Sequence, residues 1–332
     1  MTTRLLASAA ALALIAGSAE AFTLDVLHVN DFHSRIEPIN AFDSTCPAAD
    51  DAAGKCFGGV ARLATMINGL RGEIRSAGGN VLVLDAGDPY QGSLYYTTYK
   101  GKAEAEFMQA IGFDAMAVGN HEFDDGPEGL ANLLDIVTFP VISSNLDVSQ
   151  SNVLAGRIAK HAVLEVGGRK VGIVSALTRD TIEIASPGPT VIFQEEIEAL
   201  RAAVADLEGQ GVNVILALTH VGLPADLEIA ARVAGVDAVI GGHSHTYLSA
   251  SNPARHGAYP TWVTQDDGTA VPVVQAYAYG KYVGHLTLEF DDAGRLLHAG
   301  GDTMLVDASV APDPAIAARV AELGGPIEEL KA

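Results

Sequence analysis

The segment that decides the fold reads LDVLHVNDFH, from Leu24 to His33. Residues 24–29 form an apolar run typical of a buried β-strand, and two side chains that can bind metal, Asp31 and His33, follow it directly. Four later apolar runs are followed in the same way by an aspartate, an asparagine or a histidine. They are 81–84 before Asp88, 115–118 before Asn120, 212–218 before His220, and 238–240 before His243. Because open α/β sheets bind ligands beyond the carboxyl ends of their strands, we expect these side chains to converge on one rim.

The rest of the chain alternates strand-like and helix-like segments, which predicts an α/β fold. Further strands are expected at 141–143, 171–175, 271–275 and 286–290, of which the last two suggest an antiparallel portion. Apolar residues spaced three and four apart predict amphipathic helices over 60–74, 197–207 and 227–233.

The first 21 residues have the features of a secretory signal peptide. Arg4 supplies the positive charge, an apolar stretch covers 5–16, and Ala19-Glu20-Ala21 is a small-residue cleavage site. The alternative is an uncleaved anchor, but the apolar stretch is short for a membrane span. We therefore expect an exported, periplasmic or extracellular protein whose mature chain begins at Phe22.

The net charge argues against binding to nucleic acid or anionic lipid, and the two cysteines indicate a disulfide. The chain carries 20 basic and 41 acidic residues, a net charge of −21, which repels nucleic acid and anionic lipid. Its only two cysteines, Cys46 and Cys56, lie in a polar segment. In an oxidising compartment such a pair predicts a disulfide, and the alternative of a metal pair lacks further ligands nearby.

The candidate ligands divide into two sets around two ions. We expect Asp31, His33 and His245 to hold the first ion, and Asn120, His220 and His243 to hold the second. Asp88 has two carboxylate oxygens and can bridge both ions. Mixed imidazole and carboxylate ligands suit Zn²⁺ or Mn²⁺ rather than Ca²⁺. Two such ions roughly 3.5–4 Å apart activate a bridging hydroxide for an in-line displacement on phosphorus.

Gly119-Asn120-His121-Glu122 adds a candidate catalytic residue. His121 is next to a proposed ligand and is better placed to donate a proton than to bind the same ion. Asp124, three residues later, can orient the imidazole and stabilise its charged form. The remaining histidines (His28, His161, His256, His285 and His298) are expected to be structural or surface residues without partners.

These motifs resemble the calcineurin-like metallophosphoesterases, and more closely the N-terminal domain of bacterial periplasmic and ecto-5′-nucleotidases. The segments that carry the resemblance are 27–35, 56–63, 85–101, 117–124 and 271–282. It implies a sandwich of mixed β-sheets flanked by helices, with a dinuclear metal site at the carboxyl ends of the strands. It also implies the ligand and catalytic roles given above. Family members often carry Gln or Asn where this chain has His245.

The resemblance implies a phosphoesterase domain over 22–312 and the start of a linker helix over 313–332. In the 5′-nucleotidases that helix leads to a C-terminal nucleoside-binding domain, which is absent from this chain. The expected function is hydrolysis of nucleoside 5′-monophosphates or related phosphate monoesters. The alternatives are a phosphodiesterase or pyrophosphatase acting on cyclic nucleotides or nucleotide sugars, and a non-catalytic module that binds metal and nucleotide.

Overall fold

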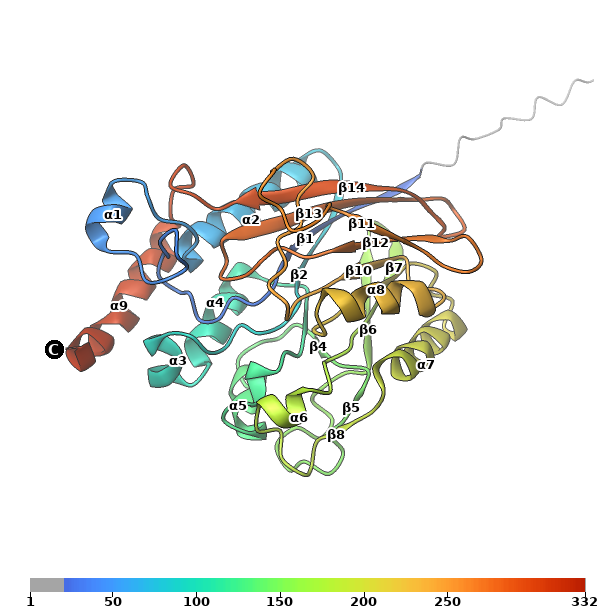
Figure 1. Cartoon of the computed structure of the whole chain (residues 1–332), viewed down its shortest axis with the longest axis horizontal. Helices are drawn as coiled ribbons and strands as arrows, with labels where there is room; N and C mark the ends of the chain where they lie inside the picture. The colour runs from blue at the N-terminus through green and yellow to red at the C-terminus, as the bar shows by residue number, and fades with distance from the viewer. Residues whose placement is uncertain (1–20, 332) are drawn as a thin grey trace, which may run out of the picture.

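Two six-stranded β-sheets lie face to face and carry helices on their outer surfaces (Figure 1). A computed structural model describes residues 21–331. The expected signal peptide therefore lies outside the described residues except for its last residue, Ala21. The observed arrangement is the sandwich of mixed sheets that the motifs implied.

The first sheet is parallel in one half and antiparallel in the other. Its order is β14 (Leu296–Leu305), β13 (Tyr282–Phe290), β1 (Phe22–Val29), β2 (Asn80–Asp85), β3 (Ala115–Ala117) and β4 (Val141–Ile142). The four strands from β1 to β4 are parallel, while β13 runs antiparallel to both β1 and β14. The parallel half places the carboxyl ends of β1, β2 and β3 side by side.

The second sheet repeats this plan with antiparallel strands at both edges. Its order is β11 (Thr261–Thr264), β12 (Ala270–Val274), β10 (Ala238–Ile240), β9 (Ile215–Leu218), β7 (Arg169–Val174) and β6 (His161–Val166). The inner strands are parallel, and β11 and β6 are antiparallel to their neighbours. A separate pair joins β5 (Leu146–Asp147) to β8 (Ile192–Phe193).

The helices cover the outer faces of the two sheets (Figure 1). The first sheet packs against α2 (Val60–Ser76), α4 (Lys102–Ile111) and α5 (Pro127–Leu134), and the second against α7 (Glu196–Gly209) and α8 (Leu223–Arg232). The short helices are α1 (Ala48–Ala52), α3 (Leu94–Tyr99), α6 (Thr181–Ile184) and the 3₁₀ turn η1 (His121–Phe123). The last helix, α9 (Pro314–Lys331), packs against α2 and α3.

Strand alternation explains why the inner strands are apolar throughout. Leu24 and Val26 of β1 pack into the layer between the sheets, whereas Leu27 and Val29 belong to the cluster beneath the helices of the first sheet. Both faces of the strand are thus covered, as is typical of parallel strands, and the sequence of such a strand is a nearly continuous apolar run.

The expected elements are present, with several shifted boundaries and several omissions. The strand expected from residue 286 begins at Tyr282, and the helix expected from residue 227 begins at Leu223. The strand expected from residue 212 begins at Ile215, because Val212 instead closes the end of α7 by donating its N–H to Leu207 O. The edge strands β6, β11 and β14 were not anticipated, since their outer faces are partly exposed and break the apolar pattern.

Two further expectations concern covalent structure and membranes. Cys46 and Cys56 form the expected disulfide, with their Cα atoms 6.0 Å apart, and Cys56 is fully buried. Within residues 21–331, no helix combines the length and apolar character that a membrane span requires.

Candidate metal centre

The candidate ligands gather at the carboxyl ends of five strands from both sheets. Asp31 follows β1, Asp88 follows β2, and Asn120 follows β3, while His220 and His243 follow β9 and β10 of the other sheet. The donor atoms of six candidate ligands form two groups, and within each group the atoms lie within 4.8 Å of one another. The groups are Asp31, His33 and His245, and Asp88, His220 and His243.

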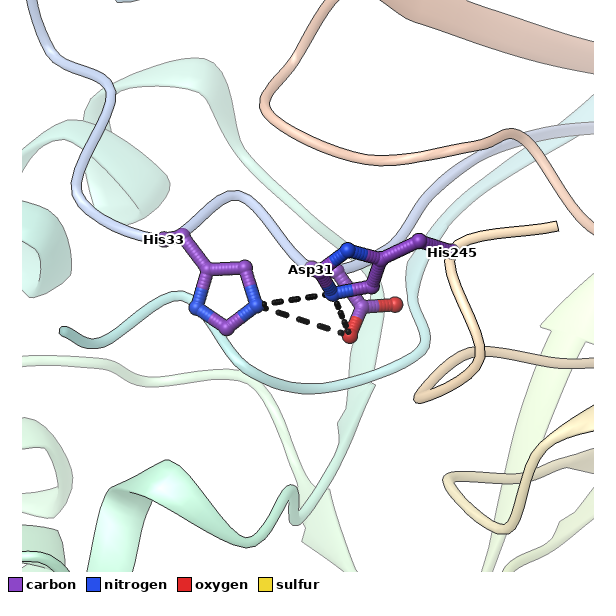
Figure 2. Close-up of side chains that lie close together, drawn as sticks. All are labelled: Asp31, His33 and His245. Atoms are coloured by element: carbon purple, nitrogen blue, oxygen red, sulfur yellow. Dashed lines mark hydrogen bonds and ion pairs between the residues drawn. The ribbon is translucent and has the colours of Figure 1, made fainter. Parts of the chain in front are cut away.

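In the first group, two imidazoles point at one carboxylate (Figure 2). His245 Nε2 lies 3.2 Å from Asp31 Oδ1, and His33 Nε2 lies 3.8 Å from the same oxygen. The two Nε2 atoms are 3.0 Å apart. Such convergence of nitrogen and oxygen donors on one point is the arrangement that a divalent cation requires.

In the second group, His220 is the central residue. Its Nε2 lies 3.0 Å from Asp88 Oδ2 and 3.1 Å from Asn120 Oδ1. The His243 ring packs edge-on against that of His220, with ring centroids 5.1 Å apart. Asp88 Oδ2 also lies 4.0 Å from His33 Nε2, so this carboxylate reaches both groups. The position of Asp88 is the one expected of a bridging ligand.

Backbone carbonyls orient two of the imidazoles. His220 Nδ1 lies 2.7 Å from Ala86 O, and His33 Nδ1 lies 3.1 Å from Tyr90 O. A carbonyl only accepts hydrogen bonds, so each Nδ1 carries a proton, and in the neutral imidazole Nε2 would present its lone pair to the centre. Histidines that bind metals are typically held in this way by a partner on the other ring nitrogen.

The polar atoms at the centre fit a bound cation. Asp31 Oδ1 is buried and accepts no hydrogen bond from any described residue, whereas Oδ2 accepts from Asn30 Nδ2 and from His243 N–H. A buried carboxylate oxygen without a donor is costly unless an ion satisfies it. Burial opposes ionisation of Asp31, but His220 and His245 outweigh it and hold the pKa of Asp31 below its usual value.

His121 and Asp124 lie at the edge of the centre. His121 Nδ1 is 2.7 Å from Asp124 Oδ2, as the spacing predicted. Burial lowers the pKa of His121, but the hydrogen bond to Asp124 and the charge of Asp88 outweigh it, so the pKa is raised. His121 also forms a third group of donor atoms with His33 and Asp88. Its side chain is therefore closer to the ligand atoms than expected, although its backbone N–H is already bound to Asp88 Oδ1 at 2.9 Å.

Comparisons with known proteins agree with this geometry. The family model described as calcineurin-like phosphoesterase matches residues 24–247. The chain belongs to this family. It is 44% identical over 315 residues to the 5′-nucleotidase of Bos taurus, covering 93% of this chain and 54% of that protein. It is 45% identical over 310 residues to the 5′-nucleotidase of Homo sapiens, covering 91% of this chain and 53% of that protein.

A solved structure is similar as well. The 5′-nucleotidase precursor from Thermus thermophilus superposes with a TM-score of 0.85 at 40% identity, covering 93% of this chain and 60% of that one. The chain thus spans about half the length of the curated relatives it matches. Calcineurin-like phosphoesterases use a dinuclear divalent metal site, and this chain contains candidate ligand clusters for one.

The backbone of this calcineurin-like phosphoesterase differs from expectation at its ligands. Asp31 and His33 are two residues apart, a spacing that in a regular strand would place both side chains on one face. Both instead lie beyond β1 in the left-handed region, with φ values of 50° and 49°. Asp88, His243 and His245 share this conformation, with φ values of 59°, 74° and 48°. Left-handed aspartate and histidine are uncommon, and such strained residues cluster at functional sites.

Glu122 is a buried residue for which the sequence suggested no role. Its Oε2 accepts from the N–H of Gly119 at 2.7 Å and from the N–H of Asp88 at 3.2 Å. Burial and the nearby Asp88 raise the pKa of Glu122 well above its usual value. Glu122 therefore ties the loop that carries Asp88 to the loop that carries Asn120. Its place in the Gly-Asn-His-Glu motif was the only available signal.

Four of the five histidines outside the centre have polar partners. His161 Nε2 lies 3.5 Å from Asp206 Oδ2. His285 Nε2 lies 2.7 Å from Asp25 Oδ1, His256 Nδ1 accepts from Tyr247 N–H, and His28 Nε2 lies 2.7 Å from Tyr259 Oη. The expectation that His161, His256 and His285 lack partners was wrong, since these partners come from residues close in space that sequence spacing does not reveal.

A cavity of about 860 Å³ lies away from the metal centre. Three residues of its lining show where it lies. Asn213 precedes β9, Asp237 precedes β10, and Trp262 lies on β11. It therefore opens at the amino ends of the parallel strands β9 and β10, away from the end at which ligands bind in such sheets.

Proposed function

We propose that this chain hydrolyses phosphate monoesters, most readily nucleoside 5′-monophosphates, with two divalent metal ions. The observation that supports this most strongly is the pair of ligand groups on either side of Asp88, with His121 at their edge. Identity above 40% to two 5′-nucleotidases supports the substrate class. The metal identity we propose is Zn²⁺ or Mn²⁺, because the donors are imidazole nitrogens and carboxylate oxygens.

The residues divide into ligands and a catalytic pair. Asp31, His33 and His245 hold the first ion, Asn120, His220 and His243 hold the second, and Asp88 belongs to both. Two bound ions supply Lewis-acid activation of water and stabilise charge on the phosphoryl oxygens. The net charge of −21 repels phosphate elsewhere on the surface, so the metal site is where a phosphate settles.

His121 supplies the proton transfer in this scheme. Asp124 Oδ2 accepts a hydrogen bond from His121 Nδ1–H, which leaves His121 Nε2–H free to face the substrate. The raised pKa of His121 favours the protonated imidazole, which can donate to the leaving oxygen or to a phosphoryl oxygen. Asp124 stabilises the charged ring until the proton is transferred.

The domain and location assignments extend this proposal. The signal-like segment before Phe22 and the similarity to 5′-nucleotidases support export to the periplasm or the cell exterior. We assign residues 22–312 to the phosphoesterase domain and 313–332 to a linker helix, which the helix α9 at Pro314–Lys331 supports. We expect weak discrimination between nucleosides, because the residues assigned here bind the phosphate and the metal ions rather than the base.

The test compares substrates with metal-loaded protein. AMP, a cyclic nucleotide and UDP-glucose are assayed side by side, with chelator-treated protein and the His121→Asn variant as controls. We expect hydrolysis of AMP, its loss on chelation and its recovery with Mn²⁺ or Zn²⁺. Faster cleavage of the cyclic nucleotide or of UDP-glucose would establish a phosphodiesterase or pyrophosphatase. Metal binding without cleavage of any ester would establish a binding module and overturn the proposal.

A further inference from the structure

Gln91 lies beside the proposed catalytic pair, where its side chain is hydrogen-bonded to Asp124. It follows Tyr90 and precedes α3, and its backbone is left-handed with a φ of 71°. The N–H of Gly92 donates to Gln91 Oε1 at 3.0 Å. Because this bond fixes which end of the amide is the oxygen, Gln91 Nε2 must face the opposite side, where Asp124 lies.

Gln91 and His121 converge on one atom of Asp124. Gln91 Nε2 donates to Asp124 Oδ2 at 3.0 Å, and His121 Nδ1 lies 2.7 Å from the same oxygen. The Asp124 side chain is 18% exposed and that of His121 is 30% exposed, so water can compete for both. A second donor on Oδ2 holds the carboxylate in the rotamer that His121 requires.

The turn that carries Gln91 is itself held against the metal centre. A Cβ on Gly92 would lie 2.8 Å from His33 O, so the turn packs directly on the backbone of a proposed ligand. Arg35 Nη1 also donates to Gly92 O. The position of the Gln91 amide is thus set by the same segment that places His33. The two hydrogen bonds of the Gln91 side chain go to Asp124 and Gly92, not to the donor atoms of the ligand groups.

We propose that Gln91 is a positioning residue that orients Asp124, and through it His121, relative to the metal centre. This inference rests on the proposed function, since it assigns His121 and Asp124 to proton transfer. Partners of this kind, one shell behind the reacting groups, typically contribute about 10- to 100-fold in activity. Loss of the amide donor should therefore lower kcat by about 10-fold and leave KM for AMP and the metal content unchanged.

A double-mutant cycle tests whether Gln91 acts through Asp124. Gln91→Met keeps the length of the side chain and removes its donor. Gln210→Met is the matched control, because Gln210 lies on the surface and contacts His161 rather than the centre. In an Asp124→Ala background the shared oxygen is absent, so we expect Gln91→Met to change kcat by less than about 2-fold. An equal loss in both backgrounds, or no loss in either, would overturn the inference.

A second measurement does not depend on activity. In the zinc-loaded protein, the His121 Nδ1 proton is followed by NMR as a hydrogen-bonded resonance, assigned by its absence from His121→Asn. We expect faster exchange of this proton with water in Gln91→Met than in the parent protein or Gln210→Met. Unchanged exchange would refute the positioning role. If no ester were cleaved by any variant, the proposed function would fail, and this exchange rate would still decide the role of Gln91.

Discussion

Replacement of Gly119 by alanine tests the close packing that the metal centre requires. A Cβ at residue 119 would lie in hard contact with Oδ1 and N of Asp88 and 2.7 Å from Glu122 Oε2. Ordinary contacts begin at 3.4 Å, so Glu122 Oε2 must move by roughly 0.7 Å and the Asp88 carboxylate by more. Gly119, Asp88 and Glu122 are all buried, so they have little room to yield.

The expected loss of metal and of activity follows from the small displacements that metal ligands tolerate. Ligand distances are held to within about 0.2 Å, and a displacement of about 1 Å near the reacting groups costs on the order of 100-fold in rate. We expect Gly119→Ala to lose at least one of two bound ions and at least about 100-fold in kcat/KM. Overpacking should also lower the free energy of unfolding by about 1–3 kcal/mol.

The assay combines metal analysis, AMP hydrolysis and denaturant unfolding on the same preparations. Gly69→Ala is the matched control, because Gly69 lies within α2 and a Cβ there would meet no atom within 4 Å. The control should keep both ions and full activity and gain about 0.5–1 kcal/mol from helix propensity. A Gly119→Ala variant that keeps both ions and activity within about 3-fold of the parent would refute the packing argument.

Three other perturbations test individual residues. His121→Asn should lower kcat by about 100- to 10,000-fold and leave metal content intact, and loss of metal would instead identify His121 as a ligand. His245→Asn should shift metal preference in a titration and retain activity; loss of both ions would contradict the assignment of His245. Burial opposes protonation of His220, but Asp88 and Asp31 raise its pKa from 6.5 to about 10. In the metal-free protein, the ion pairs of His220 should stabilise the fold fully below pH 6.5, and this stabilisation should disappear as the pH rises through about 10. In the metal-loaded protein His220 is neutral, so the free energy of unfolding should show no such decrease over this pH range.

The sequence alone determined the class of fold and the identity of the candidate ligands. Apolar runs of strand length revealed β1, β2, β3, β9 and β10, because most side chains on both faces of these strands are buried and apolar. Metal-ligand chemistry is restricted to a few residue types, so a carboxylate or imidazole placed directly after such a run stands out. The edge strands β6, β11 and β14 did not stand out, since half-exposed strands carry mixed side chains.

Only the tertiary structure decided how those ligands are aimed and supported. The left-handed conformations of Asp31, Asp88 and His243 depend on loops packed from both sheets, and no residue pattern encodes them. The hydrogen bonds of Glu122 and Gln91 join segments about 30 residues apart, so their roles are invisible until the chain is folded. The sequence determines which residue types are available as ligands. The orientation of those side chains depends on contacts between segments that are distant in the sequence, and a metal site requires both.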